Sequence, residues 1–94
     1  MSKYTMKFTS QFKKDVKRSK KQNKDIDLLF EIIDKLSNGE TLDKKYKAHT
    51  LKGKLAGITE CHIEPDWLLE YQYYEKQLIL MCIRVGSHNE LFEK

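Results

Sequence analysis

The sequence predicts an α+β domain in which two helices pack on a mainly antiparallel sheet, with the element order β-α-α-β-β-β. Two observations support this prediction. Apolar residues recur at helical spacing as far as Leu36, whereas from Ile58 onward apolar and polar residues largely alternate, as they do in strands. The chain has 94 residues, of which 39% are apolar. This is enough for one thin core, so we expect a single domain over residues 1–94.

The first elements are expected to be a short strand and a basic helix. Tyr4–Phe8 alternates between apolar and polar residues, and Thr9 or Ser10 can cap the helix that follows. The apolar residues of this helix form only a narrow stripe of Phe12 and Val16. We therefore expect the helix to dock by one edge and to leave its lysines in water.

A second helix, starting at Asn23 or Asp25, is expected to be the main cover of the core. Its apolar residues fall at helical spacing, and acidic residues occupy the other face. Asn38-Gly39 supplies a left-handed stop. The apolar positions of this helix are Ile26, Leu29, Phe30, Ile33 and Leu36.

Three strands are expected after a lysine-rich connector. They cover Ile58–Glu64, Trp67–Tyr74 and Leu78–Val85, with Pro65 as an interruption and Glu75-Lys76 at the hairpin turn.

The register of the last hairpin follows from the length of its turn. A two-residue turn pairs Trp67 with Arg84, whereas a three-residue loop or a bulge pairs Asp66 with Arg84. Both registers are compatible with the sequence.

Charge is strongly segregated along the chain, whose net charge is +4. Residues 1–24 hold eight lysines and Arg18 against the single acid Asp15, and residues 44–54 hold five lysines and no acid. Residues 60–75 hold five acidic side chains and no Lys or Arg. A one-sided basic surface attracts phosphate polymers, although a lysine-rich face is often only solvated. Nucleic acid is therefore a candidate partner.

Several other classes of protein are not expected. No stretch approaches the roughly 20 apolar residues that span a bilayer, and no secretory signal is visible, so we expect no membrane partner and a cytoplasmic location. Cys61 and Cys82 are expected to be reduced and buried, with a disulfide between them as the alternative. They lack metal-ligand spacing, and we expect neither a metal nor a cofactor.

Five residues of the second half carry the candidate chemistry. They are His49, His62 and His88, together with Asp66 and Arg84. Each one alone has an ordinary structural explanation, since a single histidine is usually a surface or hydrogen-bonded residue. In a strand, however, residues two or four apart share a face, so His62 and Asp66 are expected to point the same way if Pro65 does not shift the phase.

This set of residue types suits cleavage of RNA without a metal. The ribose 2′-OH must lose a proton and the leaving 5′-oxygen must gain one, and histidines can perform both transfers. An arginine can stabilise the added negative charge through paired hydrogen bonds. Trp67 and Phe92 are candidates for stacking on a base. A metal site is a weaker alternative, because acid-rich coordination is missing.

Three segments carry a resemblance to a known family. They are His49-Thr50-Leu51-Lys52-Gly53, the run ECHIEPDWLLEY over residues 60–71, and the run RVGSHNELF over residues 84–92. Over about residues 46–92 the chain resembles the RelE superfamily of bacterial toxins, and within it the histidine-rich YafQ-like branch. The resemblance implies a microbial-ribonuclease-like fold. It also implies an mRNA-cleaving toxin that acts in the A site of the 70S ribosome and is silenced by a cognate antitoxin.

The resemblance also implies roles for individual residues. His49, His62, Asp66 and His88 form the acid–base set, in which His88 is the general acid and His49 or Asp66 the base. Arg84 stabilises the phosphate. Trp67 and Phe92 position the RNA, with a core position as the ordinary alternative for Trp67. The charge of the basic segments, rather than the resemblance, adds Lys52, Lys13, Lys14, Lys17 and Arg18 to the residues expected to bind RNA.

Two other functions fit part of the sequence. A catalytically silent RNA- or ribosome-binding module needs the basic helix but not three histidines and Asp66. A co-repressor that acts only with its antitoxin needs the antitoxin-binding surface but no active site.

Overall fold

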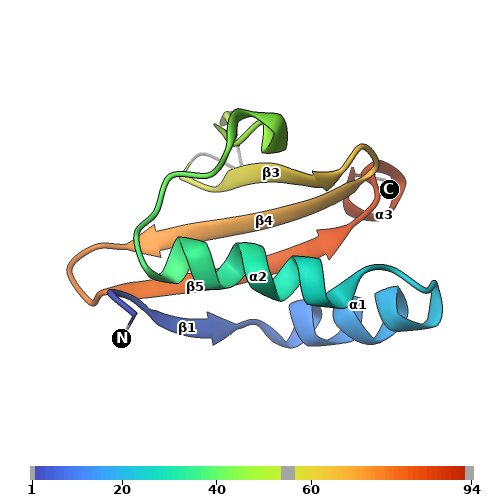
Figure 1. Cartoon of the computed structure of the whole chain (residues 1–94), viewed down its shortest axis with the longest axis horizontal. Helices are drawn as coiled ribbons and strands as arrows, with labels where there is room; N and C mark the ends of the chain where they lie inside the picture. Colours follow the sequence, from blue (N-terminus) through green and yellow to red (C-terminus); the bar gives the residue numbers. More distant parts are fainter. Residues whose placement is uncertain (1, 54–56, 93–94) are drawn as a thin grey trace.

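The computed structural model describes residues 2–53 and 57–92, and it contains five strands, three α-helices and one 3₁₀ helix in that part of the chain (Figure 1). In chain order these are β1 (Thr5–Phe8), α1 (Ser10–Lys21), α2 (Ile26–Ser37), the 3₁₀ helix η1 (Lys44–Tyr46), β2 (His49–Thr50), β3 (Thr59–Glu64), β4 (Trp67–Tyr74), β5 (Ile79–Gly86) and α3 (His88–Phe92).

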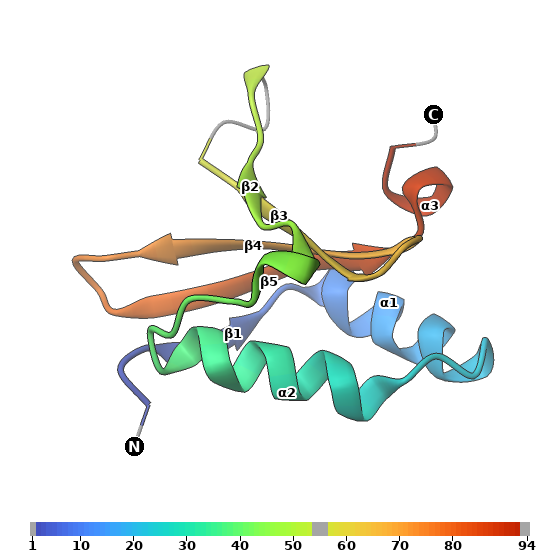
Figure 2. The same ribbon diagram turned by 45° about the horizontal axis from the view of Figure 1, so that its top comes forward.

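The strands form one sheet in the order β1-β5-β4-β3-β2. Only β1 and β5 are parallel, and the other neighbours are antiparallel. Helices α1 and α2 cover one face, while β2 and α3 rise on the other side of the sheet (Figure 2). The predicted α+β fold is confirmed, and the sequence reading missed only the small elements β2, η1 and α3. These three elements surround the face that the two long helices leave open.

Both long helices begin at side chains that the sequence offered as caps. Thr9 Oγ1 accepts from the backbone N–H of Phe12 at 2.9 Å, and Asp25 Oδ1 accepts from that of Leu28 at 3.0 Å. These bonds satisfy N–H groups that have no partner within the first helical turn. Gly39, with φ +79°, follows the end of α2, so the predicted stop is confirmed.

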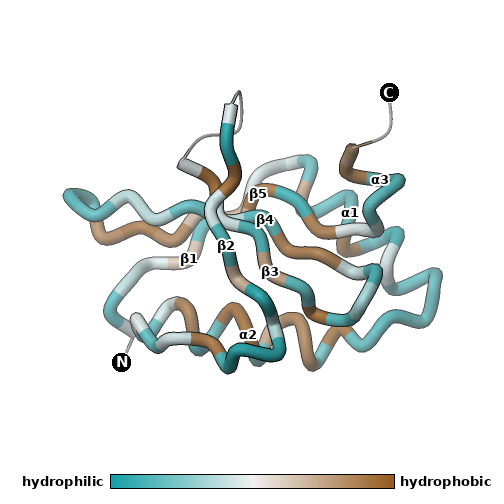
Figure 3. Tube along the Cα trace, turned by 90° about the horizontal axis from the view of Figure 1, so that it is seen from above, coloured by the Kyte–Doolittle hydropathy of each residue, from teal (hydrophilic) through white to brown (hydrophobic). Residues whose placement is uncertain are grey.

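The core lies between the helices and the covered face of the sheet. Leu29, Ile33 and Leu36 of α2 are buried as predicted, but Phe30 is 38% exposed and Ile32 is buried instead. Figure 3 shows apolar segments along α2 and the central strands, whereas α1 is largely hydrophilic. Cys61 and Cys82 are free and fully buried, as expected, and burial raises the pKa of each thiol to about 12. No helix in the described ranges is long and apolar enough to cross a membrane.

Neither of the two registers predicted for the last hairpin is observed. Tyr74 pairs with Ile79, so the connection has four residues, and an irregularity between Glu70 and Tyr71 shifts the ladder once more. As a result Arg84 lies opposite Glu70, and neither Trp67 nor Asp66 is its partner.

Helix α1 makes more contacts with the sheet than its narrow apolar stripe predicts, because its polar side chains also bind the backbone of β5. Strand β1 ends at Phe8, opposite Cys82, so the last part of β5 has no strand neighbour on that side. Side chains of α1 replace the strand: Asp15 Oδ2 accepts from the N–H of Val85 at 3.1 Å, and Arg18 Nη2 donates to the Val85 carbonyl at 3.0 Å. Asp15 is fully buried by this contact.

Candidate active site

The three histidines form a row on the open face of the molecule. The ring centroid of His62, on β3, lies 6.3 Å from that of His49 on β2 and 5.7 Å from that of His88 on α3. Phe92 continues the row, with its centroid 6.4 Å from that of His88. Residues that are far apart in the sequence thus meet where β2 and α3 rise beside β3; Figure 2 shows these three elements.

His88 is held by Asp66, which lies in the turn between β3 and β4. One carboxylate oxygen, Asp66 Oδ1, lies 2.6 Å from His88 Nδ1 and accepts from the His88 backbone N–H at 3.0 Å. These hydrogen bonds, from the backbone first and the ring second, lower the pKa of Asp66. Because an ionised carboxylate can only accept, Nδ1 carries a proton and Nε2 is the ring atom left to exchange one.

His49 has an acceptor at each ring nitrogen. Its Nδ1 lies 2.9 Å from the backbone carbonyl of Lys47, and its Nε2 lies 3.3 Å from Glu60 Oε1. Glu60 is the cross-strand partner of His49 in the β2–β3 ladder. A neutral imidazole has one N–H and can donate to only one of these acceptors, whereas the protonated ring can donate to both.

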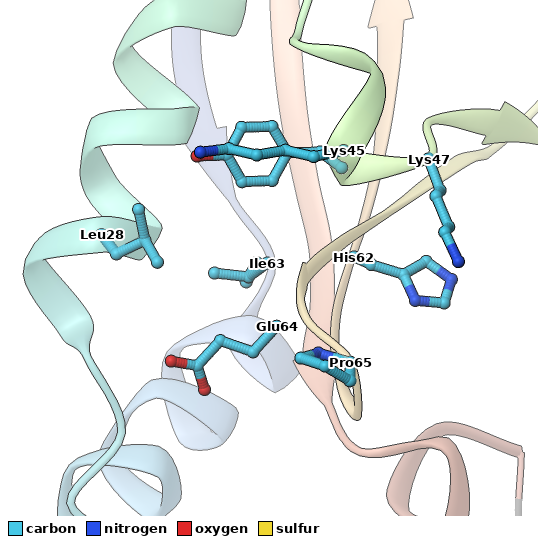
Figure 4. Close-up of a pocket in the computed structure, with 8 residues that line it drawn as sticks. Leu28, Lys45, Lys47, His62, Ile63, Glu64 and Pro65 are labelled. Carbon is cyan, nitrogen blue, oxygen red and sulfur yellow. The ribbon is translucent and has the colours of Figure 1, made fainter.

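His62 occupies the middle of the row, and its ring nitrogens have no hydrogen-bond partner within residues 2–53 and 57–92. In Figure 4 the Lys47 side chain reaches toward this ring. The His62 ring is therefore open on both nitrogens to an incoming ligand.

Two buried carboxylates beside the row were missed in the sequence. Glu60 and Glu70 lie directly opposite each other on β3 and β4, and each is only 5% exposed. Burial raises the pKa of Glu70, and the neighbouring charge of Glu60 raises it further. Across the four strands β2, β3, β4 and β5, the paired positions are His49, Glu60, Glu70 and Arg84, so the two acids lie between the histidine and the arginine. The sequence offers only a weak indication of these two acids: Glu60 lies two residues before His62 and so shares its face of the strand. The strand register is needed to place Glu70 opposite Glu60.

Arg84 is oriented by Asp15 of α1. Its Nε and Nη2 donate to the two carboxylate oxygens of Asp15 at 2.9 and 3.1 Å. Burial alone would raise the pKa of Asp15, but hydrogen bonds from Arg84, Gln11 and Val85 lower it overall. The hydrogen bonds that Arg84 donates to Asp15 also raise the pKa of Arg84. Since a guanidinium has five N–H donors, Arg84 keeps donors for a phosphate.

The other predicted RNA-binding residues fall into two groups. Lys13, Lys14, Lys17 and Lys52 are exposed, as is Phe92 at 39%. Trp67 is only 1% exposed and packs in the core, with its Nε1 3.4 Å from Ser19 Oγ. A stacking role for Trp67 is therefore incompatible with its placement. Alternation alone could not reveal this, because both faces of β4 are buried near Trp67.

Arg18, which was predicted to bind RNA, makes its contacts within the chain instead. Its guanidinium forms ion pairs of 3.1 Å with both Asp15 and Glu90, in addition to its bond to Val85. It stabilises the packing of α1 against β5 and α3, unlike the neighbouring lysines.

Comparisons with known proteins agree with this arrangement. The family described as bacterial toxin of type II toxin-antitoxin system, YafQ, matches residues 4–93. The mRNA interferase toxin YafQ of Escherichia coli strain K12 is 37% identical over 86 residues, which cover 90% of this chain and 91% of the relative.

Solved structures show the same fold. A metal-bound toxin from Helicobacter pylori superposes with a TM-score of 0.89 at 40% identity, over 95% of this chain and 99% of that one. The toxin-antitoxin complex DinJ-YafQ of E. coli gives a TM-score of 0.87 at 34% identity, over 96% of this chain and 98% of that one. This chain therefore belongs to the YafQ family of toxins of type II toxin–antitoxin systems.

Proposed function

We propose that this chain is an mRNA interferase, a metal-independent endoribonuclease that cuts mRNA in the ribosomal A site and so inhibits translation. The observation that carries the proposal is the row of three imidazoles, with His88 Nδ1 held 2.6 Å from Asp66 Oδ1. Three proton-exchanging rings beside a phosphate-binding arginine suit phosphodiester cleavage better than simple binding. The E. coli relative is named an mRNA interferase toxin.

His88 acts as the general acid. Asp66 fixes its Nδ1 and orients the ring, so Nε2 delivers the proton to the leaving 5′-oxygen. Asp66 is then the orienting partner of His88, which leaves it poorly placed to be the general base.

His62 is the base that the geometry favours, because its ring has no hydrogen-bond partner within the described ranges. It removes the proton from the ribose 2′-OH as O2′ attacks phosphorus and the bond to the 5′-oxygen breaks. His49, flanked by Glu60 and the Lys47 carbonyl, supplies positive charge beside the phosphate when protonated. Arg84 adds the N–H groups that Asp15 leaves unused.

The surroundings supply the substrate contacts. Phe92 offers an exposed ring beside His88 for a base, and Lys13, Lys14, Lys17 and Lys52 neutralise phosphates of mRNA and of ribosomal RNA. A cognate antitoxin silences the toxin in a hetero-oligomer, as the DinJ-YafQ complex suggests. Action on ribosomes implies a cytoplasmic location.

Induced expression of the wild-type chain and of His88→Ala tests the proposal. We expect the wild type to arrest growth and to produce new mRNA ends, and we expect His88→Ala to do neither, because loss of general acid catalysis costs roughly 100- to 10,000-fold in rate. A folded His88→Ala chain that still cuts mRNA at the wild-type rate would contradict the assignment. A silent binding module would show ribosome association without new ends in either strain, and a co-repressor would show neither.

A further inference from the structure

A pocket lies beside the histidine row, at the outer edge of β3. Its volume is about 510 Å³, within the range of small-molecule sites. Strand β2 pairs only with Thr59 and Glu60, so the rest of this edge is left to η1 and the start of α2. Figure 4 shows His62 and Lys47 on one side of the strand and Leu28, Ile63 and Glu64 on the other.

The lining combines apolar walls with four charged or polar side chains, which are Lys45, Lys47, His62 and Glu64. Leu28, Ile63, Pro65 and Tyr46 supply the walls. The ammonium of Lys45 lies 5.2 Å from the centroid of the Tyr46 ring, which itself packs against the core. An apolar slot bordered by lysines matches a nucleotide, whose base is flat and whose phosphate is anionic.

Glu64 is the acceptor in this pocket. Its side chain is half-buried, and its carboxylate has no hydrogen bond or ion pair within residues 2–53 and 57–92. A carboxylate can only accept, so it selects ligands that present N–H donors. Adenine, cytosine and guanine each carry an exocyclic amino group, whereas uracil presents its one N–H donor between two carbonyl oxygens that repel a carboxylate.

We propose that this pocket receives the base of a nucleotide next to the scissile phosphate, and that Glu64 selects amino-bearing bases over uracil. This inference rests on the proposed function. His62 belongs to the catalytic row and also lines the pocket, so the two adjoin, and RNA bound at the row reaches Glu64 by turning around the outer edge of β3. An apolar side chain of a protein partner would leave the Glu64 carboxylate without a donor, which is unfavourable in a half-buried site.

The test is cleavage of a reporter mRNA library, randomised around one codon, on 70S ribosomes stalled at that codon. With the wild type we expect uracil to be depleted on the order of 10-fold at one position beside the cut. Glu64→Gln should abolish this depletion, because an amide can also donate to uracil O4. The matched control is Glu40→Gln, which removes an exposed carboxylate outside the pocket and should retain the wild-type profile.

A second variant, Leu28→Trp, fills the pocket from α2. We expect it to slow cutting on the order of 10-fold and to flatten the base preference. Because Leu28 also packs against the core, the midpoint of thermal unfolding is measured to confirm that the variant is folded at the assay temperature. Wild-type cutting with no uracil depletion, or depletion that survives Glu64→Gln, would overturn the proposal while leaving the proposed function standing.

Antitoxin affinity, measured on the same variants, tests whether the pocket binds a protein partner instead of a base. Unchanged cleavage profiles with weakened antitoxin binding would mean that the pocket docks protein, which also overturns the proposal. A wild-type chain that cuts no message would contradict the proposed function itself, and the role of the pocket with it.

Discussion

Arg18 of α1 and Glu90 of α3 form an ion pair of 3.1 Å that ties the helix carrying His88 to the N-terminal helix. Gln22 donates a second bond to Glu90 Oε2 at 2.9 Å, and the backbone N–H of Ser87 donates to Oε1 at 2.8 Å. Gly86 permits this approach, because a Cβ there would lie 2.8 Å from Arg18 Nη2. The position of His88 thus depends on residues far from the histidine row.

Glu90→Ala should therefore impair catalysis even under conditions in which the fold is retained. The ion pair is partly exposed and adds up to about 1 kcal/mol, and loss of the capping contact to Ser87 adds about 1 kcal/mol more. We expect the unfolding midpoint to fall by roughly 8–16 °C. At a temperature where the variant is still folded, we expect a lower single-turnover cleavage rate with unchanged ribosome affinity. The control is Glu31→Ala, which removes a weaker pair of 4.0 Å with Lys35 on α2. A cleavage rate equal to that of the control would show that the Arg18–Glu90 ion pair only stabilises the fold.

Asp15→Ala should be among the most destabilising single substitutions in the chain. It removes the partner of Arg84, Arg18 and the Val85 N–H at once, and it does so at a fully buried position. Breaking a buried pair costs about 3–5 kcal/mol, because it leaves an uncompensated charge. Chemical denaturation should report this loss, and a change below about 1 kcal/mol would contradict the network.

Glu70→Gln should stabilise the fold at neutral pH. The pKa of Glu70 is raised in the folded state by burial and then by Glu60, so folding favours its protonated form. Above the raised pKa the folded chain must hold an ionised, buried carboxylate, and the amide removes this penalty. The unfolding midpoint of Glu70→Gln should exceed that of wild type at pH 7. The gain should shrink as the pH falls through the raised pKa of Glu70 and vanish below the ordinary glutamate pKa. A variant less stable than wild type at pH 7 would show that Arg84 needs this charge.

Charge reversal of Lys13, Lys14 and Lys17 should weaken ribosome association and leave the fold intact. Each lost phosphate contact should reduce the salt slope of binding by about one. Arg18 must be kept in this experiment, because it is paired within the chain. Reversal of Lys7, Lys35 and Lys76, three exposed lysines elsewhere, is the matched control for net charge. Equal ribosome pelleting by both triple variants across a salt titration would argue against a specific basic face.

Local patterns predicted most of the fold. Helical spacing and the caps at Thr9 and Asp25 located α1 and α2, and alternation located the long strands. The hairpin register could not be read in the same way, since it depends on a four-residue connection and on one irregularity at Glu70. Moving the register changes every cross-strand neighbour, which is why Arg84 was expected opposite the wrong residues.

In the candidate site, too, some residues could be identified from the sequence and others could not. The histidines, Asp66 and Arg84 were identifiable by residue type, and the structure joins His88 to Asp66. Glu60 and Asp15 were not identifiable, because their roles arise from contacts between segments distant in sequence. The choice between a core position and a stacking role for Trp67 could not be made for the same reason, since it depends on how α1 packs on β4.

The chemistry at the cut is tested most directly by the ends of the cleaved message. If His62 and His88 transfer protons during attack by the 2′-OH, the upstream fragment ends in a 2′,3′-cyclic phosphate and the downstream fragment begins with a 5′-hydroxyl. The downstream fragment should then ligate to an adaptor only after kinase treatment, and a 2′-deoxyribose at the scissile position should abolish cutting there. Direct ligation through a native 5′-phosphate, with cutting that survives the deoxy substitution, would indicate a metal-activated water and contradict the account.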